Sequence, residues 1–275
     1  MKALTLGLTV PRFVSFHPHS PSISIFSSRS FHTLSATCDK SASSKRYVRR
    51  AQTDPYGKAK SSSKGEKVYI ARSAHKLIQL DQQLKLFPRY TRTHVLDLGA
   101  APGGWTEVAL ERLGQIRIDR QHQHRLIACD LLPLTQSLLA NVPSNTKLFP
   151  IQGDFLKPDT HSQIINALGC HSSSLPVPTI ILSDLLGSLS GIPVRDAQNS
   201  LDLCLSVIEL AKALLRTNGP EADALVIKHI QSGLTDELRT ELSNNWQTVK
   251  WIKPLASRSE SREGYFVARD RKAPQ

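Results

Sequence analysis

Long apolar runs are missing from this sequence, and no stretch approaches the roughly 20 residues that a helix needs to cross a bilayer. Cysteine is also scarce. The four cysteines are widely spaced and form no C-x-x-C pair, which argues against a structural zinc site and a disulfide-built secreted fold; they are Cys38, Cys129, Cys170 and Cys204. Because Cys129 and Cys204 lie in apolar runs, we expect both in the core of a protein from a reducing compartment.

Acidic residues are absent from positions 1–38, which instead contain basic residues and many serines. This composition is typical of an organelle transit peptide. A secretory signal is the rival interpretation because residues 3–10 are apolar, but Pro11 and Arg12 interrupt that run and no small-residue cleavage site follows. We therefore predict a transit peptide for the mitochondrial matrix, with the plastid as an alternative.

Positive charge is concentrated at the amino-terminal end. Residues 1–70 hold 12 Lys or Arg against 3 Asp or Glu, whereas residues 71–275 hold 23 against 20. The segment 39–67 is rich in Ser, Lys and Arg and cannot bury much apolar surface, so we predict a basic disordered linker. The folded domain is then expected over residues 68–272, preceded by an arm that serves as an address or a nucleic-acid tether.

Apolar strands and amphipathic helices alternate from residue 72 onward. The expected strands are 93–98, 125–130, 147–152, 179–183, 224–230, 248–252 and 265–268. The expected helices are 72–86, one that ends at 113, a long one through Leu201 and Leu215 that stops at Asn218-Gly219, and 235–243. This alternation predicts an α/β domain with a doubly wound sheet.

Four of the expected strands end in a carboxylate or are followed by one: Asp97, Asp130, Asp154 and Asp184. In an open α/β sheet, ligands bind beyond the carboxyl ends of the strands, so we expect these side chains to line one site. For any one aspartate alone, capping of the strand end is the alternative role. The Gly-rich turn after Asp97 favours a shared ligand site for all four.

Phosphate-binding signatures are absent, because the chain contains neither G-x-x-x-x-G-K-[ST] nor G-x-G-x-x-G. A carboxylate-lined pocket instead suits a ligand with a ribose diol, an amine and a cationic centre, and S-adenosylmethionine has all three. We expect Asp130 to accept hydrogen bonds from the ribose hydroxyls and Asp154 to lie near the adenine amine. Gly103 and Gly104 are expected to let the backbone approach the ligand, since a Cβ at either position would obstruct it.

Three motifs in this part of the chain resemble the FtsJ family of S-adenosylmethionine-dependent RNA 2′-O-methyltransferases. They are Asp-Leu-Gly-Ala-Ala-Pro-Gly-Gly-Trp at 97–105, Ala-Cys-Asp-Leu-Leu-Pro at 128–133 and Gln-Gly-Asp-Phe at 152–155. The similarity covers about residues 64–272 and implies a Rossmann-like methyltransferase sheet, mostly parallel with an antiparallel last strand. The cofactor-binding residues that it implies are Gly99, Pro102, Gly103, Gly104, Trp105, Asp130, Asp154 and Asp184.

The same resemblance implies a Lys-Asp-Lys-Glu catalytic tetrad, and the matching residues are Lys76, Asp184, Lys228 and Glu263. Lys228 would orient or deprotonate a ribose 2′-hydroxyl, and Asp184 would hold Lys228 and touch the cofactor. Lys76 and Glu263 would tune charge and position. From the residues alone, a snorkelling surface lysine remains the alternative for Lys228, and ordinary surface positions remain the alternative for Lys76 and Glu263.

The loop after the fourth expected strand departs from the family's usual pattern. Gly187 and Ser188 stand where the family usually has Pro and Asn, and losing the fixed φ of proline is expected to loosen the acceptor side of the pocket. Residues 115–124 look like an insertion that forms a solvated loop. We expect no bound metal because the histidines near the motifs lack a pattern such as H-E-x-x-H; we interpret them as packing or RNA-contact residues, namely His75, His94 and His229.

The favoured function is methylation of a ribose 2′-hydroxyl, a uridine by resemblance, in mitochondrial large-subunit ribosomal RNA or its precursor. The sequence does not indicate an oligomeric state. One alternative keeps this chemistry but places it on a transfer RNA in the cytoplasm. Another is a ribosome-assembly factor that binds RNA on a catalytically weak methyltransferase fold; the intact tetrad argues against it, and the altered loop keeps it open.

Overall fold

The computed structural model describes residues 67–169, 177–217, 223–258 and 261–273. The predicted transit peptide and all but the last residue of the predicted linker lie outside these described residues, as do Cys38 and Cys170. Among the helices of the described residues, none is both long and apolar enough to cross a membrane.

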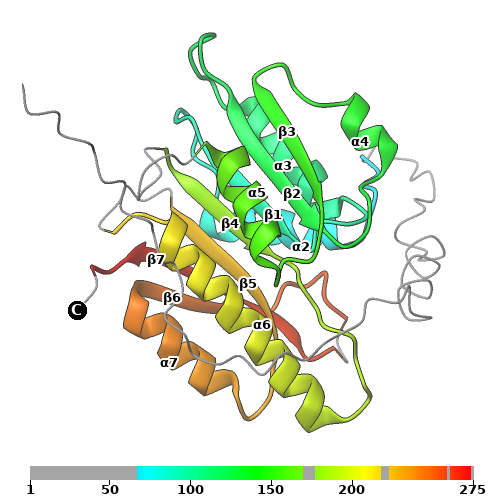
Figure 1. The fold of residues 1–275 in the computed structure, drawn as a ribbon, viewed down its shortest axis with the longest axis vertical. Coiled ribbons are helices and arrows are strands. Elements are labelled where there is room, and N and C mark those ends of the chain that lie inside the picture. Colours follow the sequence, from blue (N-terminus) through cyan, green and yellow to red (C-terminus); the bar gives the residue numbers. More distant parts are fainter. Residues whose placement is uncertain (1–66, 170–176, 218–222, 259–260, 274–275) are drawn as a thin grey trace, which may run out of the picture. The chain divides into compact units, whose positions relative to one another are not determined.

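The described strands form one seven-stranded sheet in the order β3-β2-β1-β4-β5-β7-β6 (Figure 1). Their bounds are β1 His94–Leu98, β2 His124–Asp130, β3 Thr146–Gln152, β4 Thr179–Ser183, β5 Ala224–Ile230, β6 Trp246–Ile252 and β7 Glu263–Arg271. Strands β1 to β5 are parallel to one another, whereas β7 runs antiparallel to both β5 and β6. The predicted fold class is therefore confirmed, including the antiparallel last strand.

Helices cover both faces of this sheet. On one face lie α2 (Ser73–Leu84), α3 (Gly104–Gln115) and the short α4 (Gln136–Ala140); on the other lie α5 (Pro158–Leu168), α6 (Pro193–Leu214) and α7 (Thr235–Asn245). The sequence patterns did not predict α4 and α5. Helix α6 ends at Leu214, before the expected stop at Asn218-Gly219, which lies outside the described residues.

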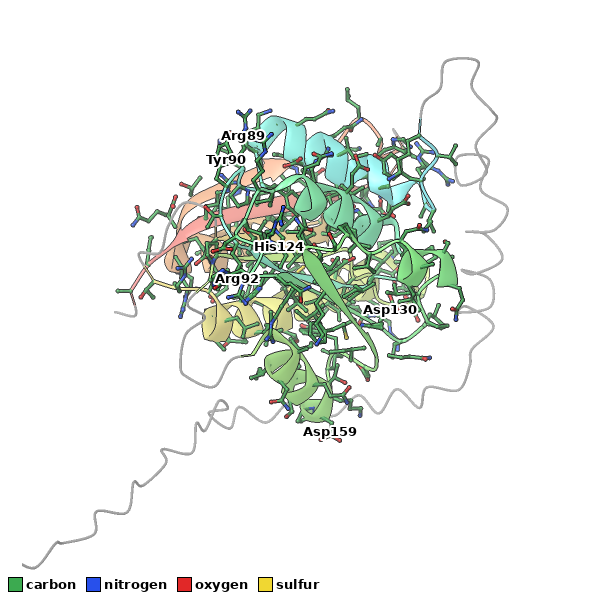
Figure 2. All side chains as sticks on the ribbon, turned by 90° about the horizontal axis from the view of Figure 1, so that it is seen from above. Arg89, Tyr90, Arg92, His124, Asp130 and Asp159 are labelled. Atoms are coloured by element: carbon green, nitrogen blue, oxygen red, sulfur yellow. The ribbon has the colours of Figure 1, made fainter. Side chains whose placement is uncertain are left out.

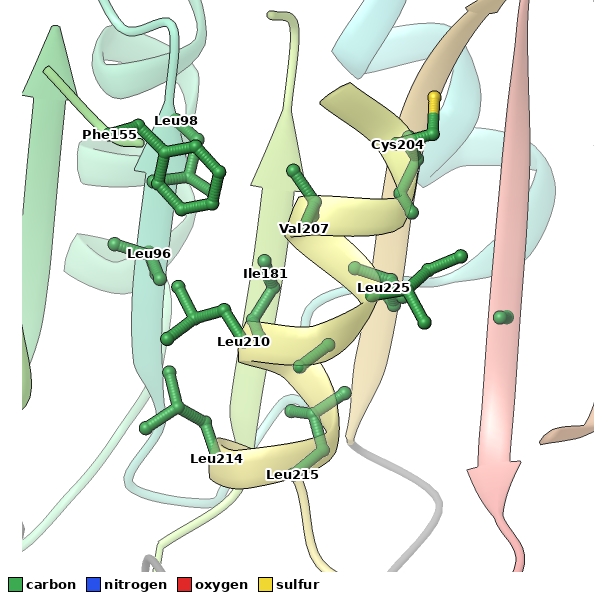
Figure 3. Packing of buried hydrophobic residues seen from close by; sticks show 14 of the residues in the cluster. Leu96, Leu98, Phe155, Ile181, Cys204, Val207, Leu210, Leu214, Leu215 and Leu225 are labelled. Carbon is green, nitrogen blue, oxygen red and sulfur yellow. The ribbon is translucent and has the colours of Figure 1, made fainter. Parts of the chain in front are cut away.

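Burial on both faces explains why most residues of the central strands are apolar. Every residue of β1 and of β4 is buried, as expected for parallel strands with helices on each side. Figure 3 shows how α6 places Val207 and Leu210 over the strand residues Leu96 and Ile181. Cys129 and Cys204 are each 1% exposed, which confirms the prediction that both are core residues.

The topology gathers the functional loops at the carboxyl ends of the parallel strands, here called the carboxyl edge of the sheet. The order reverses between β1 and β4, so the connections that follow these strands diverge and leave a ligand crevice beyond their carboxyl ends. Because β6 is parallel to β5, the loop that joins β6 to β7 also lies at this edge. Glu263 at the start of β7 is therefore brought to the carboxyl end of β5, where it pairs with Ile230.

Candidate active site

Lys228 is buried near the end of β5 and makes two contacts with Asp184. Its Nζ donates a hydrogen bond to the Asp184 backbone oxygen at 2.5 Å and lies 3.0 Å from the carboxylate Oδ1. The parallel pairing of Ser183 with Ile227 explains this contact, since it places the next residue of each strand side by side. With its side chain only 7% exposed, Lys228 is not a snorkelling surface lysine.

Tyr265 is a member of this cluster that the sequence analysis missed. Its hydroxyl donates to Asp184 Oδ1 at 2.8 Å, so this oxygen accepts from both Tyr265 and Lys228. Tyr265 is fully buried and pairs directly with Lys228 across the β5–β7 ladder. The signal was present in the sequence, because residues two apart on a strand share a face and Glu263 was already a candidate.

Lys76 and Glu263 form a second ion pair in the same cluster. Lys76 Nζ lies 2.8 Å from Glu263 Oε2, and their side chains are 13% and 25% exposed. Burial acts to raise the pKa of Glu263, but the charges of Lys76 and Lys228 outweigh it and hold the pKa below its ordinary value. Lys76 Nζ also lies 5.9 Å from the centroid of the Tyr265 ring. Tyr265 therefore lies next to both ion pairs, with its ring near Lys76 and its hydroxyl on Asp184.

The Gly-rich turn packs closely against its neighbours, for reasons partly different from those predicted. Gly99 has a φ of +78°, and a Cβ there would lie 3.0 Å from the Leu185 nitrogen. Gly103 has a φ of +127°, and its Cβ would collide with the side chain of Leu138 in α4. A Cβ at Gly104 would lie 2.6 Å from Ser73 Oγ at the start of α2. The protein's own packing therefore already excludes a side chain at Gly103 and Gly104, without any ligand.

Asp130 and Asp154 each hold the backbone that surrounds them. Asp130 Oδ2 accepts from the Ala101 amide, and its Oδ1 accepts from the Leu132 amide, both at 2.9 Å. Asp154 Oδ1 accepts from the Leu156 amide at 2.9 Å. Both aspartates are half-buried, and a carboxylate has about four acceptor positions, so each retains capacity for a ligand.

Asp97 is a fully buried carboxylate beneath the turn. Its Oδ2 accepts from Thr106 Oγ1 at 2.6 Å, and its Oδ1 has no hydrogen-bond partner among the described residues. Burial raises the pKa of Asp97 to about 7; the carboxylates of Asp184 and Asp130 act in the same direction, against the Thr106 hydrogen bond. Within the described chain, the Asp97 carboxylate has only Thr106 as a hydrogen-bond partner and lies near the carboxylates of Asp184 and Asp130, an arrangement that favours a ligand with positive charge at this edge.

The remaining residues of the predicted cofactor site occupy different environments. Trp105 is 2% exposed, donates its indole N–H to the Ser73 carbonyl at 2.8 Å, and lies 5.5 Å from the Tyr265 ring. These contacts make it a packing residue that positions the turn. Pro102 is half-buried and follows a cis peptide bond after Ala101. Gly99 and Pro102 thus form the more accessible part of the turn.

Exposed leucines lie beside the two half-buried aspartates. Leu131 directly follows Asp130 and is 51% exposed, and Leu156, two residues after Asp154, is 54% exposed. An apolar side chain next to a hydrogen-bond acceptor suits a nucleoside. The flat base can pack against the apolar side chain, and the ribose hydroxyls can donate to the acceptor. No group of three or more His, Cys, Asp or Glu in the described part of the chain is arranged to hold a metal ion.

The histidines near the motifs fall into two classes. His94 and His229 are buried, and burial lowers their pKa values to about 3 and about 4, so both are neutral packing residues. The charges of Arg92 and Arg125 add to the effect at His94. His75 is exposed on α2 and remains available for an RNA contact.

The loop that follows Asp184 is held at both of its ends. Lys228 contacts Asp184 at the start, and at the far end Ser190 donates its backbone N–H and its hydroxyl to Asp196 Oδ1, both at 2.7 Å. A Cβ at Gly187 would make only ordinary contacts, the nearest with Leu203 Cδ1 at 3.5 Å. The loosening expected from Gly187 stays a prediction, and these contacts would limit it to the middle of the loop.

Comparison with known proteins gives a consistent set of similarities. Residues 69–271 match the sequence profile of the family described as FtsJ-like methyltransferase. A Ribosomal RNA large subunit methyltransferase E of Rickettsia canadensis is 31% identical over 233 residues, which cover 85% of this chain and 91% of the relative. The protein of the same name from Methanothermobacter thermautotrophicus is 34% identical over 207 residues, covering 75% of this chain and 86% of the relative.

A solved structure supports the fold. The crystal structure of a ribosomal RNA methyltransferase from Plasmodium falciparum superposes with a TM-score of 0.57 at 24% identity. It covers 75% of this chain and 100% of that one, so the whole of the solved chain has its counterpart here.

We predict that Asp97→Asn makes stability less sensitive to pH. The pKa of Asp97 is about 7 in the fold against about 3.9 for an unfolded aspartate, so the folded state binds the proton more tightly. Wild-type stability should therefore fall as pH rises from about 4 to about 7, whereas the asparagine cannot ionise. Thermal melting at about pH 5 and about pH 8 should show the variant gaining several degrees relative to wild type at the higher pH.

The matched control is Asp202→Asn, which changes an exposed aspartate on α6. Its melting temperature relative to wild type should not depend on pH in this range. A difference between Asp97→Asn and wild type that is the same at both pH values would contradict the assigned electrostatic strain at Asp97.

Proposed function

The chain belongs to the FtsJ-like methyltransferase family, and from this premise we propose that it methylates a ribose 2′-hydroxyl of large-subunit ribosomal RNA with S-adenosylmethionine. The observation that carries the proposal is the buried Lys228–Asp184 pair, held by Tyr265 beside a carboxylate-lined turn. The relatives' names, which specify the large ribosomal subunit, support the choice of RNA.

The residues at the carboxyl edge fit S-adenosylmethionine. Asp130 has acceptor capacity for the ribose diol, and Asp154 for the adenine amine. The flat base suits the exposed side chains of Leu131 and Leu156, and Asp97 and Asp184 favour the positive charge of the ammonium and sulfonium groups. When bound, the cofactor supplies an electrophilic methyl group.

The tetrad supplies what a ribose hydroxyl needs on the other side of the reaction. Lys228 Nζ orients the 2′-oxygen and takes its proton as the oxygen gains the methyl group, which requires that Lys228 has first released a proton. Asp184 and Tyr265 hold Lys228 in place, and Lys76 neutralises Glu263 beside it. Positioning of the two reactants contributes further, because it makes the encounter effectively unimolecular.

We further propose that the target is a uridine of mitochondrial large-subunit ribosomal RNA. The acid-free, serine-rich composition of residues 1–38 supports import, and the basic character of the segment that follows supports an RNA tether. Two alternatives remain for the experiments below to distinguish. One is methylation of a cytoplasmic transfer RNA, and the other is a non-catalytic role in ribosome assembly.

We predict that Lys228→Ala lowers single-turnover methyl transfer to ribosomal RNA by roughly 10²–10⁴-fold, the usual contribution of a positioned proton acceptor. Lys228→Arg should rescue little, because a guanidinium remains charged and cannot take the proton. Cofactor affinity should stay within about 1 kcal/mol of wild type by calorimetry, since Asp130 and Asp154 are held by backbone amides and not by Lys228. The matched control is Lys250→Ala, which removes an exposed lysine from β6 and should have no effect.

Three results would overturn different parts of the proposed function. Wild-type rates in Lys228→Ala would remove Lys228 from the reaction while leaving the family's chemistry in place. A wild-type protein that methylates no ribosomal RNA fragment or assembled precursor would favour the assembly factor, and methylation of transfer RNA alone would favour the cytoplasmic alternative.

Localisation has its own prediction. A fluorescent reporter that carries residues 1–45 should enter mitochondria and be shortened, because basic and serine-rich segments without acidic residues are recognised for import. The control carries Arg12→Glu and Arg29→Glu. These changes replace two basic residues with acidic ones and should keep the reporter in the cytosol. A wild-type reporter that stays in the cytosol at full length would refute mitochondrial import.

A further inference from the structure

The edge of the sheet opposite the candidate active site carries a concentration of positive charge. The connectors 85–94, leading into β1, and 115–125, leading into β2, together hold 6 Lys or Arg and 1 Asp, a net charge of +5. Residues 71–275 as a whole hold 23 basic and 20 acidic residues, a net of only +3. The rest of the folded domain therefore holds 17 basic and 19 acidic residues and is slightly negative. The excess positive charge of the whole domain lies at this one edge.

We propose that this edge is a second RNA-binding site, which holds a single-stranded segment through its phosphates and one stacked base. The surface, here called the basic edge, consists of Lys85, Arg89, Tyr90, Arg92, Arg117, Arg120, His122 and Arg125. It extends the proposed function by giving the RNA a contact that takes no part in methyl transfer.

A shallow pocket lies at the centre of the basic edge. It has a volume of about 280 Å³, and its lining residues are Tyr90, Arg92, Ile118, Asp119 and His122. Both connectors contribute to it, and hydrogen bonds tie them together: Arg92 Nε donates to the Gln123 carbonyl at 3.0 Å, and the Thr93 amide donates to His124 Nδ1 at 3.1 Å. Burial lowers the pKa of His124, which favours its neutral ring. The pocket is therefore formed before any ligand binds.

The arginines of the basic edge lack carboxylate partners in the described part of the chain. Within the described residues, no carboxylate forms an ion pair with Arg89, Arg92, Arg117, Arg120 or Arg125. Other arginines in the same domain do have carboxylate partners. Arg112 pairs with Asp81 at 2.7 Å and Arg216 pairs with Asp223 at 3.1 Å. Unpaired guanidinium groups, three of them exposed, are suited to phosphate oxygens.

Tyr90 indicates which kind of anion this surface binds. It is 75% exposed and is the one aromatic residue among the exposed large apolar side chains of the described chain. An acidic peptide would be held by the arginines but would leave the ring in water. A nucleobase stacks on such a ring, and the stacked base strengthens binding. Cations around an exposed aromatic side chain therefore favour single-stranded RNA.

The basic edge lies at the amino ends of the parallel strands, and the candidate active site lies at their carboxyl ends. Figure 2 shows Arg89, Tyr90 and Arg92 on one side and Asp130 on the other. The strand β1 between the two edges has five residues, a span of about 16 Å at about 3.3 Å per residue. A nucleotide at Lys228 therefore cannot also occupy the pocket, so the basic edge would hold a different segment of a large RNA.

The test measures binding of a fluorescent single-stranded oligouridine of roughly 12 nucleotides to the full chain at several salt concentrations. We expect Tyr90→Ala and Arg117→Glu to weaken binding by about 3- to 10-fold, with a shallower salt dependence for Arg117→Glu. Tyr90→Phe keeps the ring and should bind as wild type. Lys250→Glu makes the same charge change on β6, away from both sites, and should bind within about twofold of wild type.

Crosslinking locates the contact directly. RNA that carries 4-thiouridine should crosslink to peptides containing residues 89–92 or 117–122, in addition to any contact at the carboxyl edge. Equal losses of affinity in Arg117→Glu and Lys250→Glu, or crosslinks at the carboxyl edge alone, would overturn the proposal. So would a poly-glutamate peptide that binds more tightly than the RNA and is equally sensitive to Arg117→Glu. Because no methyl transfer is measured, failure here would leave the proposed function untouched.

Discussion

The contact between Lys228 and Asp184 determines how the carboxyl edge of the sheet is built. An ammonium group with so little access to water is costly unless it is paired and hydrogen-bonded, and Asp184 provides both a carbonyl and a carboxylate. Asp184 is itself fixed on two sides. Its amide donates to the Leu98 carbonyl of β1 at 3.0 Å, and its carboxylate accepts from Tyr265 of β7. One buried ion pair thus joins the turn after β1 to the antiparallel strand that carries Glu263.

Charge is divided between the two edges of the sheet in a way that suits two different ligands. The carboxyl edge collects aspartates from four strands, and burial, with the nearby charges of Asp184 and Asp130, raises the pKa of Asp97. A bound cation would lower the electrostatic cost of these carboxylates. The opposite edge collects arginines that have no carboxylate partner among the described residues, and the proposed RNA site lies there. On this proposal, a nearly neutral domain recognises a cation at one edge and a polyanion at the other.

Much of the fold could be predicted from the sequence, because parallel strands covered on both faces must be apolar and the helices between them amphipathic. Helix α5 was missed because few of its residues are apolar, although Pro158 in its first turn and the left-handed Gly169 after its last residue are usual helix boundaries. The resemblance implied the tetrad, but pairing across strands was needed to show the role of Tyr265. The packing reasons for Gly103 and Gly104 depend on Leu138 and Ser73, which are distant in sequence.

The central claim is that this chain places a 2′-O-methyl group on large-subunit ribosomal RNA through the Asp184–Lys228 pair. The most direct measurement is nucleotide-resolution mapping of 2′-O-methyl groups in ribosomal RNA from cells that lack the protein, with wild type or Asp184→Asn restored at equal levels. The account predicts that one methyl group in mitochondrial large-subunit RNA disappears, returns with wild type and stays absent with Asp184→Asn. Complete methylation in cells without the protein, or full restoration by Asp184→Asn, would contradict it.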